Sequence, residues 1–334
     1  MRTSLDDEET HDTGPVSTGA LPPADIVQRL VEAGHDRYRH CRDGTPAAYI
    51  PELAAVDPDL FGIALLGVDG RCHEAGDADY SFPIQSISKA FVFALVCEAV
   101  GYREARAKVG VNATGRPFDS VMAIELDPEQ RTNALVNAGA IATASLAPGA
   151  DAAAKWAFVR DGLQRFAGRE LAVIDAIYEA ETAAGGRNRG IARLLHSYDR
   201  LYAEPDVAND VYTRQCALAV TCHDLALMGA TLADGGVNPV TGERVVSPAV
   251  AKRTLALMAT AGLYEQSGDW LFEVGLPGKS GVGGGLVTVV PGKAGLAVFS
   301  PPLDDAGNSV RGQRVTKFLS ERLGLNLFAS NVAD

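Results

Sequence analysis

The sequence lacks the features that mark membrane, secreted or nucleic-acid-binding proteins. No stretch approaches the roughly 20 apolar residues that span a bilayer, and the chain does not start with the basic residues and apolar run of a signal peptide. No run is rich in Lys and Arg, and the formal net charge of −12 opposes a broad nucleic-acid or anionic-membrane surface. We therefore expect a cytoplasmic protein that acts on small molecules, with no nucleic-acid or membrane partner.

The cysteines form neither a disulfide framework nor a metal-binding pattern. They are odd in number and widely spaced, with no CxxC pair and no matching histidine cluster: Cys41, Cys72, Cys97, Cys216 and Cys222. We expect free thiols in a reducing compartment. We expect no metal ligands. Cys216 and Cys222, six positions apart in apolar sequence, are predicted core thiols. His223 and Asp224 are interpreted as polar helix surface rather than a catalytic dyad.

What is present suffices for one large folded unit. The chain has 334 residues, of which 47% are hydrophobic, enough for a sizeable core with one or two subdomains. Residues 1–22 are acidic and rich in Gly, Pro, Ser and Thr, so they are predicted to form a disordered tail. The folded domain is predicted to span 23–334, and no internal repeat indicates a solenoid.

Strand-like sequence occurs near both ends of this domain. "FGIALLGVDGRCHEAGD", residues 61–77, has two apolar arms around an Asp-Gly turn, which is a strong hairpin signal. A second strand pair is predicted where "GGLVTVVPG" and "AGLAVFSPP" flank a turn near residue 292. Helices are expected from the apolar spacing at the start, from residue 23, and at the end, in "SVRGQRVTKFLSERLG".

The long middle of the chain favours helix. "AKWAFVRDGLQRFAG", "RGIARLLHSYDRLY", "RQCALAVTCHDLALMGATLADGG" and "SPAVAKRTLALMATAG" all have helical character. This order predicts an α/β (α+β) fold, in which an antiparallel sheet from N- and C-terminal segments is flanked by helices. The sheet subdomain is predicted from about 23–104 and 263–334, with a helical subdomain inserted at about 105–262. A ligand cleft is expected between the two.

One short stretch suggests nucleophilic catalysis. In "FPIQSISKAFVFALV", Ser86 precedes Lys89 by three positions at the start of an apolar helix. Residues three apart share one helix face, and a lysine in apolar surroundings has a lowered pKa, so its neutral amine can accept the serine proton. The amide of Ser86, in a first helical turn, can help to hold an oxyanion. The competing interpretation is a helix start in which Ser86 caps the helix and Lys89 reaches the surface.

A second stretch, "LPGKSGVGGG" at 276–285, strengthens this hypothesis. An SxxK motif followed far downstream by Lys-Ser/Thr-Gly ahead of a strand is the combination of the serine β-lactamase and penicillin-binding protein superfamily. Here the triplet is Lys279-Ser280-Gly281. The glycine run could instead be a dinucleotide or phosphate loop, but such a loop needs a helix after it, and a strand-like run follows. A plain glycine-rich turn is the third possibility.

Longer motifs make a resemblance specific. "NAGAI" from residue 137, "GRNRGIA" from 186, "VYTRQCALAVT" from 211, "AGLYEQSG" from 261, the glycine-rich stretch above and "FSPPLDDAGNSVRG" from 299 occur in one order along the chain. Together they resemble the serine-dependent glutaminase family, from about Tyr49 to Leu325. The resemblance implies a β-lactamase-like fold and hydrolysis of L-glutamine to L-glutamate and ammonia, a step in glutamine catabolism and glutamate biosynthesis.

The resemblance also implies roles for individual residues. Ser86 corresponds to the nucleophile, Lys89 to the base, and the backbone of Val282 to half of the oxyanion hole. Two tyrosines that line the reacting centre correspond to Tyr49 and Tyr264. The substrate-binding residues correspond to Asn137, Glu181, Asn188 and Tyr212. Ser86, Tyr264 and Val282 contact substrate as well.

These assignments are chemically reasonable. Free glutamine carries an ammonium and a carboxylate, which a buried site must pair. Glu181 suits the ammonium, whereas Asn137, Asn188 and Tyr212 can donate hydrogen bonds to the carboxylate or the side-chain amide. Tyr264 could relay protons. No metal or organic cofactor is expected, and a homodimer or homotetramer is implied.

Two alternatives remain open from sequence. One is another serine amidohydrolase on this fold, such as a β-lactamase. The other is a catalytically inactive module that binds glutamine as a sensor.

Overall fold

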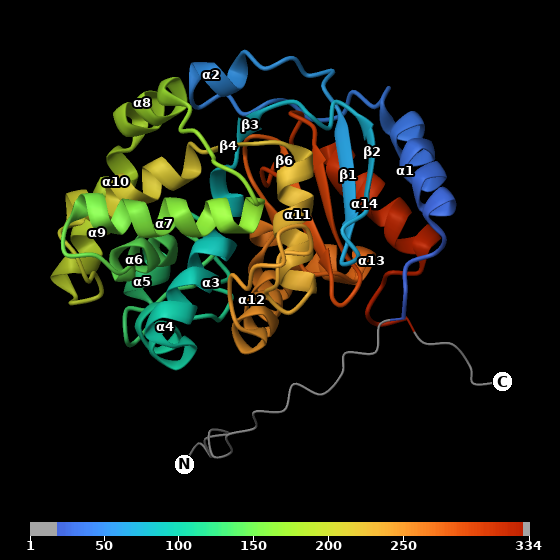
Figure 1. Ribbon diagram of the computed structural model, residues 1–334. Helices are drawn as coiled ribbons and strands as arrows, with labels where there is room; N and C mark the ends of the chain where they lie inside the picture. The colour runs from blue at the N-terminus through green and yellow to red at the C-terminus, as the bar shows by residue number, and fades with distance from the viewer. Residues whose placement is uncertain (1–18, 330–334) are drawn as a thin grey trace.

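The computed structural model describes residues 19–329 and contains seven strands among its helices (Figure 1). The strands are β1 (Gly62–Gly67), β2 (Cys72–Gly76), β3 (Phe82–Pro83), β4 (Ala219–Val220), β5 (Gly278–Ser280), β6 (Gly285–Val290) and β7 (Ala294–Phe299). The helices of the N-terminal third are α1 (Ala24–Tyr38), α2 (Pro51–Ala54), the 3₁₀ turn η1 (Gln85–Ile87), α3 (Ser88–Val100), α4 (Tyr102–Val109) and α5 (Met122–Glu125). Those that follow are α6 (Asn137–Leu146), α7 (Ala152–Ala167), α8 (Asp175–Ala184), α9 (Gly186–Ser197), α10 (Pro205–Cys216), α11 (Cys222–Ala233), α12 (Pro248–Ala261), η2 (Tyr264–Gln266), α13 (Ser267–Val274) and α14 (Val310–Leu323).

The main sheet joins the two ends of the chain, as predicted. Its strand order is β2-β1-β7-β6-β5 and every neighbouring pair is antiparallel. The β1–β2 turn closes where the Gly70 amide donates to the Gly67 carbonyl, and Gly70 has a φ of 80°, which glycine adopts without strain. The central pairing sets Gly62 opposite Phe299, so residues more than two hundred positions apart are neighbours. The predicted antiparallel sheet is confirmed.

Helices cover both faces of this sheet. In β1 the side chains alternate: Ile63 and Leu65 join the core beneath α1 and α14, whereas Ala64 and Leu66 join the core beneath α11. Every residue of β1 is buried for this reason. Figure 1 shows α1, α13 and α14 on one side of the sheet and α11 with α3, α6, α7 and α12 on the other.

The helical layer is built around two apolar helices. All ten residues of α6 are buried, and α3 is buried from Ser88 through Cys97. A helix that is apolar all round must lie inside other helices, and α3 accordingly packs against α4, α6, α7 and α12. The proposed division into sheet and helical subdomains stays a prediction, and α11, from the middle of the chain, packs on the sheet.

The helical expectation fails at one point in the middle of the chain. Sequence favoured helix across residues 214–236, but α10 ends at Cys216 and β4 pairs with β3 before α11 begins. Thr221 caps α11: its side chain accepts from the Asp224 amide, and the Asp224 carboxylate accepts from the Thr221 amide. This capping box starts a new helix inside an apolar run.

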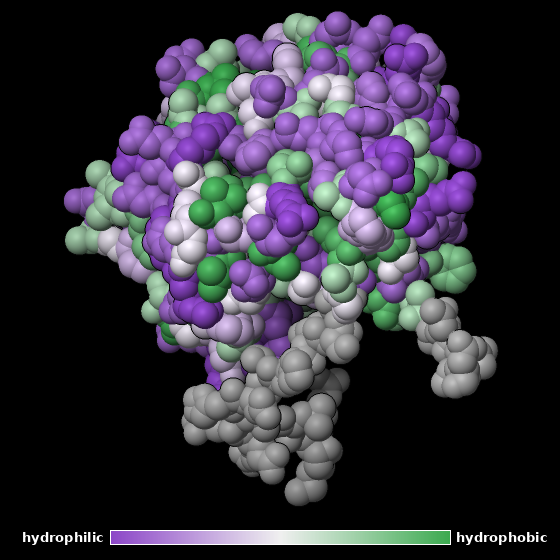
Figure 2. Space-filling model, turned by 45° about the vertical axis from the view of Figure 1, so that its right-hand side comes forward, coloured by the Kyte–Doolittle hydropathy of each residue, from purple (hydrophilic) through white to green (hydrophobic). Residues whose placement is uncertain are grey.

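The predicted tail falls mostly outside the described residues. Of residues 1–22, only 19–22 are described, and there Leu21 packs against the core beneath α1. Between residues 19 and 329, no helix combines the length and the apolar character required to cross a membrane. Figure 2 shows a face on which hydrophilic residues predominate and apolar residues form small separate patches.

Candidate active site

Ser86 and Lys89 lie where η1 runs into α3. Ser86 is in the 3₁₀ turn and Lys89 in the first turn of the helix that follows, so the serine and lysine are one turn apart on a continuous helical segment. Both are buried, with 7% and 1% of their surface exposed. The surface-lysine interpretation of the motif is therefore wrong, because Lys89 is inside the molecule.

The environment of Lys89 favours its neutral form. Its Nζ donates to the Asn137 Oδ1 at 2.7 Å and lies 5.9 and 5.7 Å from the ring centres of Phe118 and Tyr212. Burial lowers the pKa of Lys89 to about 8, although Cys216, Asp119 and Glu181 partly oppose this shift. No carboxylate within residues 19–329 forms an ion pair with Lys89. At pH 7 about a tenth of this amine is neutral and can accept a proton, and the neutral fraction rises at higher pH.

Three helices contribute a chain of hydrogen bonds behind the dyad. Asn137, the first residue of α6, accepts from the Tyr212 hydroxyl at 3.2 Å as well as from Lys89. Its amide nitrogen donates to the Asn188 Oδ1 at 3.0 Å. Because Lys89, Asn188 and Tyr212 come from α3, α9 and α10, the Asn137 amide is held from three directions.

Glu181 on α8 is the centre of a second polar group. Its Oε1 accepts from the Tyr49 hydroxyl at 2.5 Å and from the Gln85 side chain at 3.1 Å. Gln85 has a φ of 50°, a left-handed conformation that is uncommon outside glycine. Gln85 is the first residue of η1, so this left-handed backbone and the hydrogen bond to Glu181 occur together immediately before Ser86.

Tyr264 and Val282 approach Ser86 from the C-terminal half. Tyr264 also has a left-handed φ, of 53°, and its hydroxyl donates to the Ser280 carbonyl at 3.3 Å. Burial raises the pKa of Tyr264, and hydrogen bonding to Ser86 and to the Val282 backbone partly offsets the rise. Within residues 19–329, no backbone carbonyl accepts from the amide of Ser86 or Val282. Among the described residues the Ser86 amide thus has no backbone partner, whereas the Val282 amide faces the Tyr264 hydroxyl oxygen. Two N–H groups at this place are the type of donor that holds a developing oxyanion.

The glycine run explains how Val282 reaches this place. Gly281–Gly284 connects β5 to β6, so it joins two strands rather than a strand and a helix, and the dinucleotide-loop alternative is wrong. A Cβ on Gly281 would lie 3.1 Å from the Ile84 carbonyl, and one on Gly283 would lie 3.1 Å from the Pro83 carbonyl. A side chain at either position would press on the backbone before Ser86, so glycine suits this close approach.

These groups surround a cavity of about 480 Å³. Seven of the nine predicted site residues line it: Tyr49, Ser86, Asn137, Glu181, Asn188, Tyr212 and Val282. Lys89 and Tyr264 stand behind the lining and reach it through their contacts with Asn137 and with Ser86. Such a volume suits a small polar molecule. The structure thus brings all nine residues together, while their individual roles remain predictions.

Some residues around the cavity were not predicted. Lys279 is fully buried, donates to the Ser280 carbonyl at 2.6 Å, and lies 4.5 Å from the ring centre of Tyr264. Burial, together with the charge of Lys89, lowers the pKa of Lys279 well below its usual value. The Lys-Ser-Gly triplet was the sequence feature that could have identified Lys279 as a residue near the site. No local sequence feature could have identified Gln85, because its contact with Glu181 spans 96 positions.

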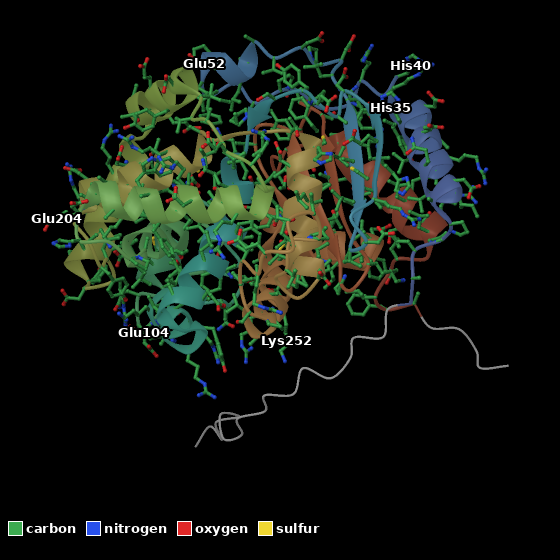
Figure 3. All side chains as sticks on the ribbon, viewed as in Figure 1. His35, His40, Glu52, Glu104, Glu204 and Lys252 are labelled. Atoms are coloured by element: carbon green, nitrogen blue, oxygen red, sulfur yellow. The ribbon has the colours of Figure 1, made fainter. Side chains whose placement is uncertain are left out.

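Four further charged residues line the cavity, Asp119, Arg187, Asp304 and Asp305, whereas many other titratable groups lie outside it. Figure 3 places Glu52, Glu104, Glu204 and Lys252 at the periphery of the molecule, on or beside outer helices. None of these four side chains lines the cavity.

The cysteines and their neighbours only partly match expectation. Cys216 and Cys222 are buried, as predicted for core thiols. Asp224 is 3% exposed and forms an ion pair with Arg169, so its assignment to the polar helix surface is wrong. The cause is the helix cap, which holds its carboxylate against the backbone of Thr221.

Cys216 is a possible competing nucleophile, because it lines the cavity. Burial raises the pKa of its thiol to about 12, however, so the reactive thiolate is scarce at neutral pH. We expect Cys216→Ala to keep turnover within about threefold of the wild type, as for other conservative changes without a chemical role. Steady-state rates of the two proteins, measured in parallel, test this, and a loss comparable to that of Ser86→Ala would contradict it.

Comparisons with known proteins agree with this geometry. A family model described as Glutaminase matches residues 44–328. Glutaminase 2 of Yersinia pestis is 55% identical over 315 residues, covering 94% of this chain and 93% of that protein. The glutaminase of Colwellia psychrerythraea is 47% identical, covering 92% of this chain and 99% of its own.

Solved structures give the same result. A probable glutaminase named YbaS has a TM-score of 0.91 at 44% identity, covering 92% of this chain and 100% of its own. A probable glutaminase from Bacillus subtilis, complexed with 6-diazo-5-oxo-L-norleucine, has a TM-score of 0.81 at 33% identity, covering 92% of this chain and 97% of its own. The predicted β-lactamase-like fold is thereby confirmed.

Proposed function

The chain belongs to the glutaminase family and hydrolyses L-glutamine to L-glutamate and ammonia, and we propose that the reaction passes through a γ-glutamyl ester on Ser86. The observation that carries the proposal is the state of Lys89. It is 1% exposed, lacks a carboxylate partner among the described residues, has a pKa of about 8, and lies one turn from Ser86. A lysine in this position is suited to act as a base rather than as a surface charge.

In the first half of the reaction, the neutral amine of Lys89 takes the Ser86 hydroxyl proton as the serine oxygen attacks the side-chain carbonyl carbon. The amides of Ser86 and Val282 hold the resulting oxyanion. The proton then passes, directly or through the Tyr264 hydroxyl, to the leaving nitrogen. The C–N bond breaks, ammonia departs, and the γ-glutamyl ester remains on Ser86.

In the second half, water replaces ammonia. It attacks the ester carbon while the same base accepts its proton, and the same two amides hold the second oxyanion. When this tetrahedral intermediate collapses, the bond between the ester carbon and the Ser86 oxygen breaks. The Ser86 oxygen regains a proton, and L-glutamate is released. Apart from this water, each step is assigned to a group of this chain.

The charged end of the substrate needs partners in the same cavity. Glu181 is the carboxylate that Tyr49 and Gln85 already hold in one orientation, and we assign it to the substrate ammonium. Asn137, Asn188 and the hydroxyl of Tyr212 can donate to the carboxylate or the side-chain amide.

The predicted subdomain division fits this arrangement. Nucleophile, base and oxyanion groups come from the proposed sheet part, about 23–104 and 263–334. The residues assigned to substrate binding come mainly from the helical part, about 105–262. Substrate then binds where the two parts meet.

Replacing Glu181 by glutamine is expected to lower kcat/KM by at least about 30-fold, mainly through a higher KM. The substrate ammonium would lose its counter-charge while the shape of the side chain is kept. Steady-state kinetics with L-glutamine measure this effect. Glu179→Gln, an exposed carboxylate on the same helix, is the matched control. Equal kinetics for the two variants would remove Glu181 from the binding site.

We also propose a homodimer or homotetramer in the cytoplasm. Phe272 on α13 is 85% exposed and Phe328 is 66% exposed, and the hydrogen bond from the Leu327 amide to the Gly275 carbonyl brings the C-terminal segment beside α13. Large apolar side chains exposed together support a self-association surface. The free cysteines support a reducing compartment.

Light scattering after size exclusion is expected to give a dimer or tetramer for the wild type, shifted toward monomer in Phe272→Ser. A monomeric wild type at assay concentration would contradict the proposed assembly.

A further inference from the structure

A second cluster of chemically active side chains lies away from the cavity, where β2 meets α11. Cys72 and Glu74 are on β2, and His223 is in the first turn of α11. Their thiol, carboxylate and imidazole ligand atoms all lie within 4.8 Å of one another. We propose that these three residues bind a divalent transition-metal ion, with Zn²⁺ as the preferred ion.

The spacing of the donor atoms suits a metal of this size. The His223 Nδ1 is 2.8 Å from the Glu74 Oε1, which is 3.4 Å from the Cys72 Sγ. Ligands of a tetrahedral zinc ion at its usual bond lengths are about 3.3–3.8 Å apart. Small side-chain rotations bring the three atoms to that separation, and water can take the fourth position.

The backbone holds the three ligands in place. Cys72 and Glu74 are two positions apart on one strand, so both side chains project from the same face. His223 follows Thr221, whose capping box fixes the start of α11. Gln28 on α1 donates to the Glu74 carbonyl at 3.0 Å and anchors the strand from its other side. The ligands therefore belong to regular elements rather than to loose loops.

The donor set selects the class of metal. A thiolate, an imidazole nitrogen and a carboxylate oxygen together favour zinc and its neighbours over magnesium or calcium, which prefer oxygen alone. On binding, the Cys72 thiol gives its proton to solvent and its sulfur forms the metal bond. The thiolate and the Glu74 carboxylate then balance the two positive charges of the ion.

The location separates this site from the reaction. β2 and β5 are the opposite edges of the sheet, and Lys279 and Ser280 of the candidate active site are on β5. A metal at β2 would connect the N-terminal hairpin to α11, which packs across the sheet. Its expected effect is on stability, through binding to the folded chain, and this inference does not depend on the proposed function.

The test uses the full chain, stripped with a chelator and titrated with Zn²⁺ against a colorimetric zinc indicator. Expected are one ion per chain, a higher melting temperature with Zn²⁺, and thiolate-to-metal charge-transfer absorption when Co²⁺ is used. Cys72→Ala and His223→Gln are each expected to weaken binding at least about tenfold. Cys41→Ala and His40→Gln, a neighbouring cysteine and histidine outside the cluster, are the matched controls and are expected to bind as the wild type does; His40 is labelled in Figure 3.

Two results would overturn the proposal. One is the absence of stoichiometric binding in the wild type. The other is binding that the Cys72 and His223 variants retain unchanged, because the ion would then be held elsewhere. Folding of each variant is checked by its melting temperature without metal, so loss of binding cannot be mistaken for loss of structure.

Discussion

Replacing Ser86 with alanine is expected to lower kcat for L-glutamine hydrolysis by at least about 10³-fold while substrate still binds. The nucleophile is lost, but Glu181, Asn137, Asn188 and Tyr212 stay in the cavity lining. Ammonia and glutamate release measures the first part, and calorimetric binding of L-glutamine to the variant measures the second. The two products are expected in equimolar amounts from the wild type alone.

The control for this variant is Ser81→Ala, an exposed serine just upstream, which is expected to keep full activity. Substantial ammonia release by Ser86→Ala would exclude the acyl-enzyme mechanism. If the wild type bound glutamine without hydrolysing it, the sensor alternative would be favoured. If it hydrolysed a chromogenic β-lactam in place of glutamine, the alternative of a β-lactamase-like amidohydrolase would be favoured.

Replacing Lys89 with methionine is expected to lower kcat by about 10²- to 10⁴-fold, the usual contribution of a positioned base. Methionine keeps the apolar bulk, so the fold should persist. Lys252→Met, on the outside of α12 (Figure 3), is the matched control. Because Ser86 and Lys89 act as a unit, the double variant is expected to be hardly slower than Ser86→Ala.

The pH dependence gives a separate measure of Lys89. The active form is the neutral amine, and its pKa is about 8. Below that value the neutral fraction, and with it kcat/KM, should rise about tenfold per pH unit, then level off above it. The rise of kcat/KM with pH should be absent in Lys89→Met. A wild-type rate that stays flat from about pH 6 to about pH 10 would contradict a titrating lysine base.

The sequence alone could predict the parts of the site that are local. Ser86 and Lys89 are three positions apart, so helix geometry relates them without knowledge of the fold. The hairpins were equally local, since an Asp-Gly turn and alternating strands need only neighbouring residues. Asn137, Glu181 and Tyr212 could be assigned only through family motifs, because no spacing relates residues on separate helices.

What could not be predicted depends on long-range packing. The hydrogen bond between Gln85 and Glu181 spans 96 positions, and the contact between Glu74 and His223 spans 149 positions. The break between α10 and α11 arises because β4 pairs with β3, far away in sequence. Lys279 was part of a recognised motif, yet its full burial against Tyr264 required the assembled sheet.

The central claim is that Ser86 forms the covalent bond to substrate. 6-Diazo-5-oxo-L-norleucine, the compound present in the Bacillus subtilis structure, has a diazoketone in place of the side-chain amide of glutamine. We would treat the wild type with it and map the modified peptide by mass spectrometry. The mechanism predicts one label per chain, on Ser86, that accumulates in step with the loss of activity. Complete inactivation with the label on Cys216 or another residue, and none on Ser86, would contradict it.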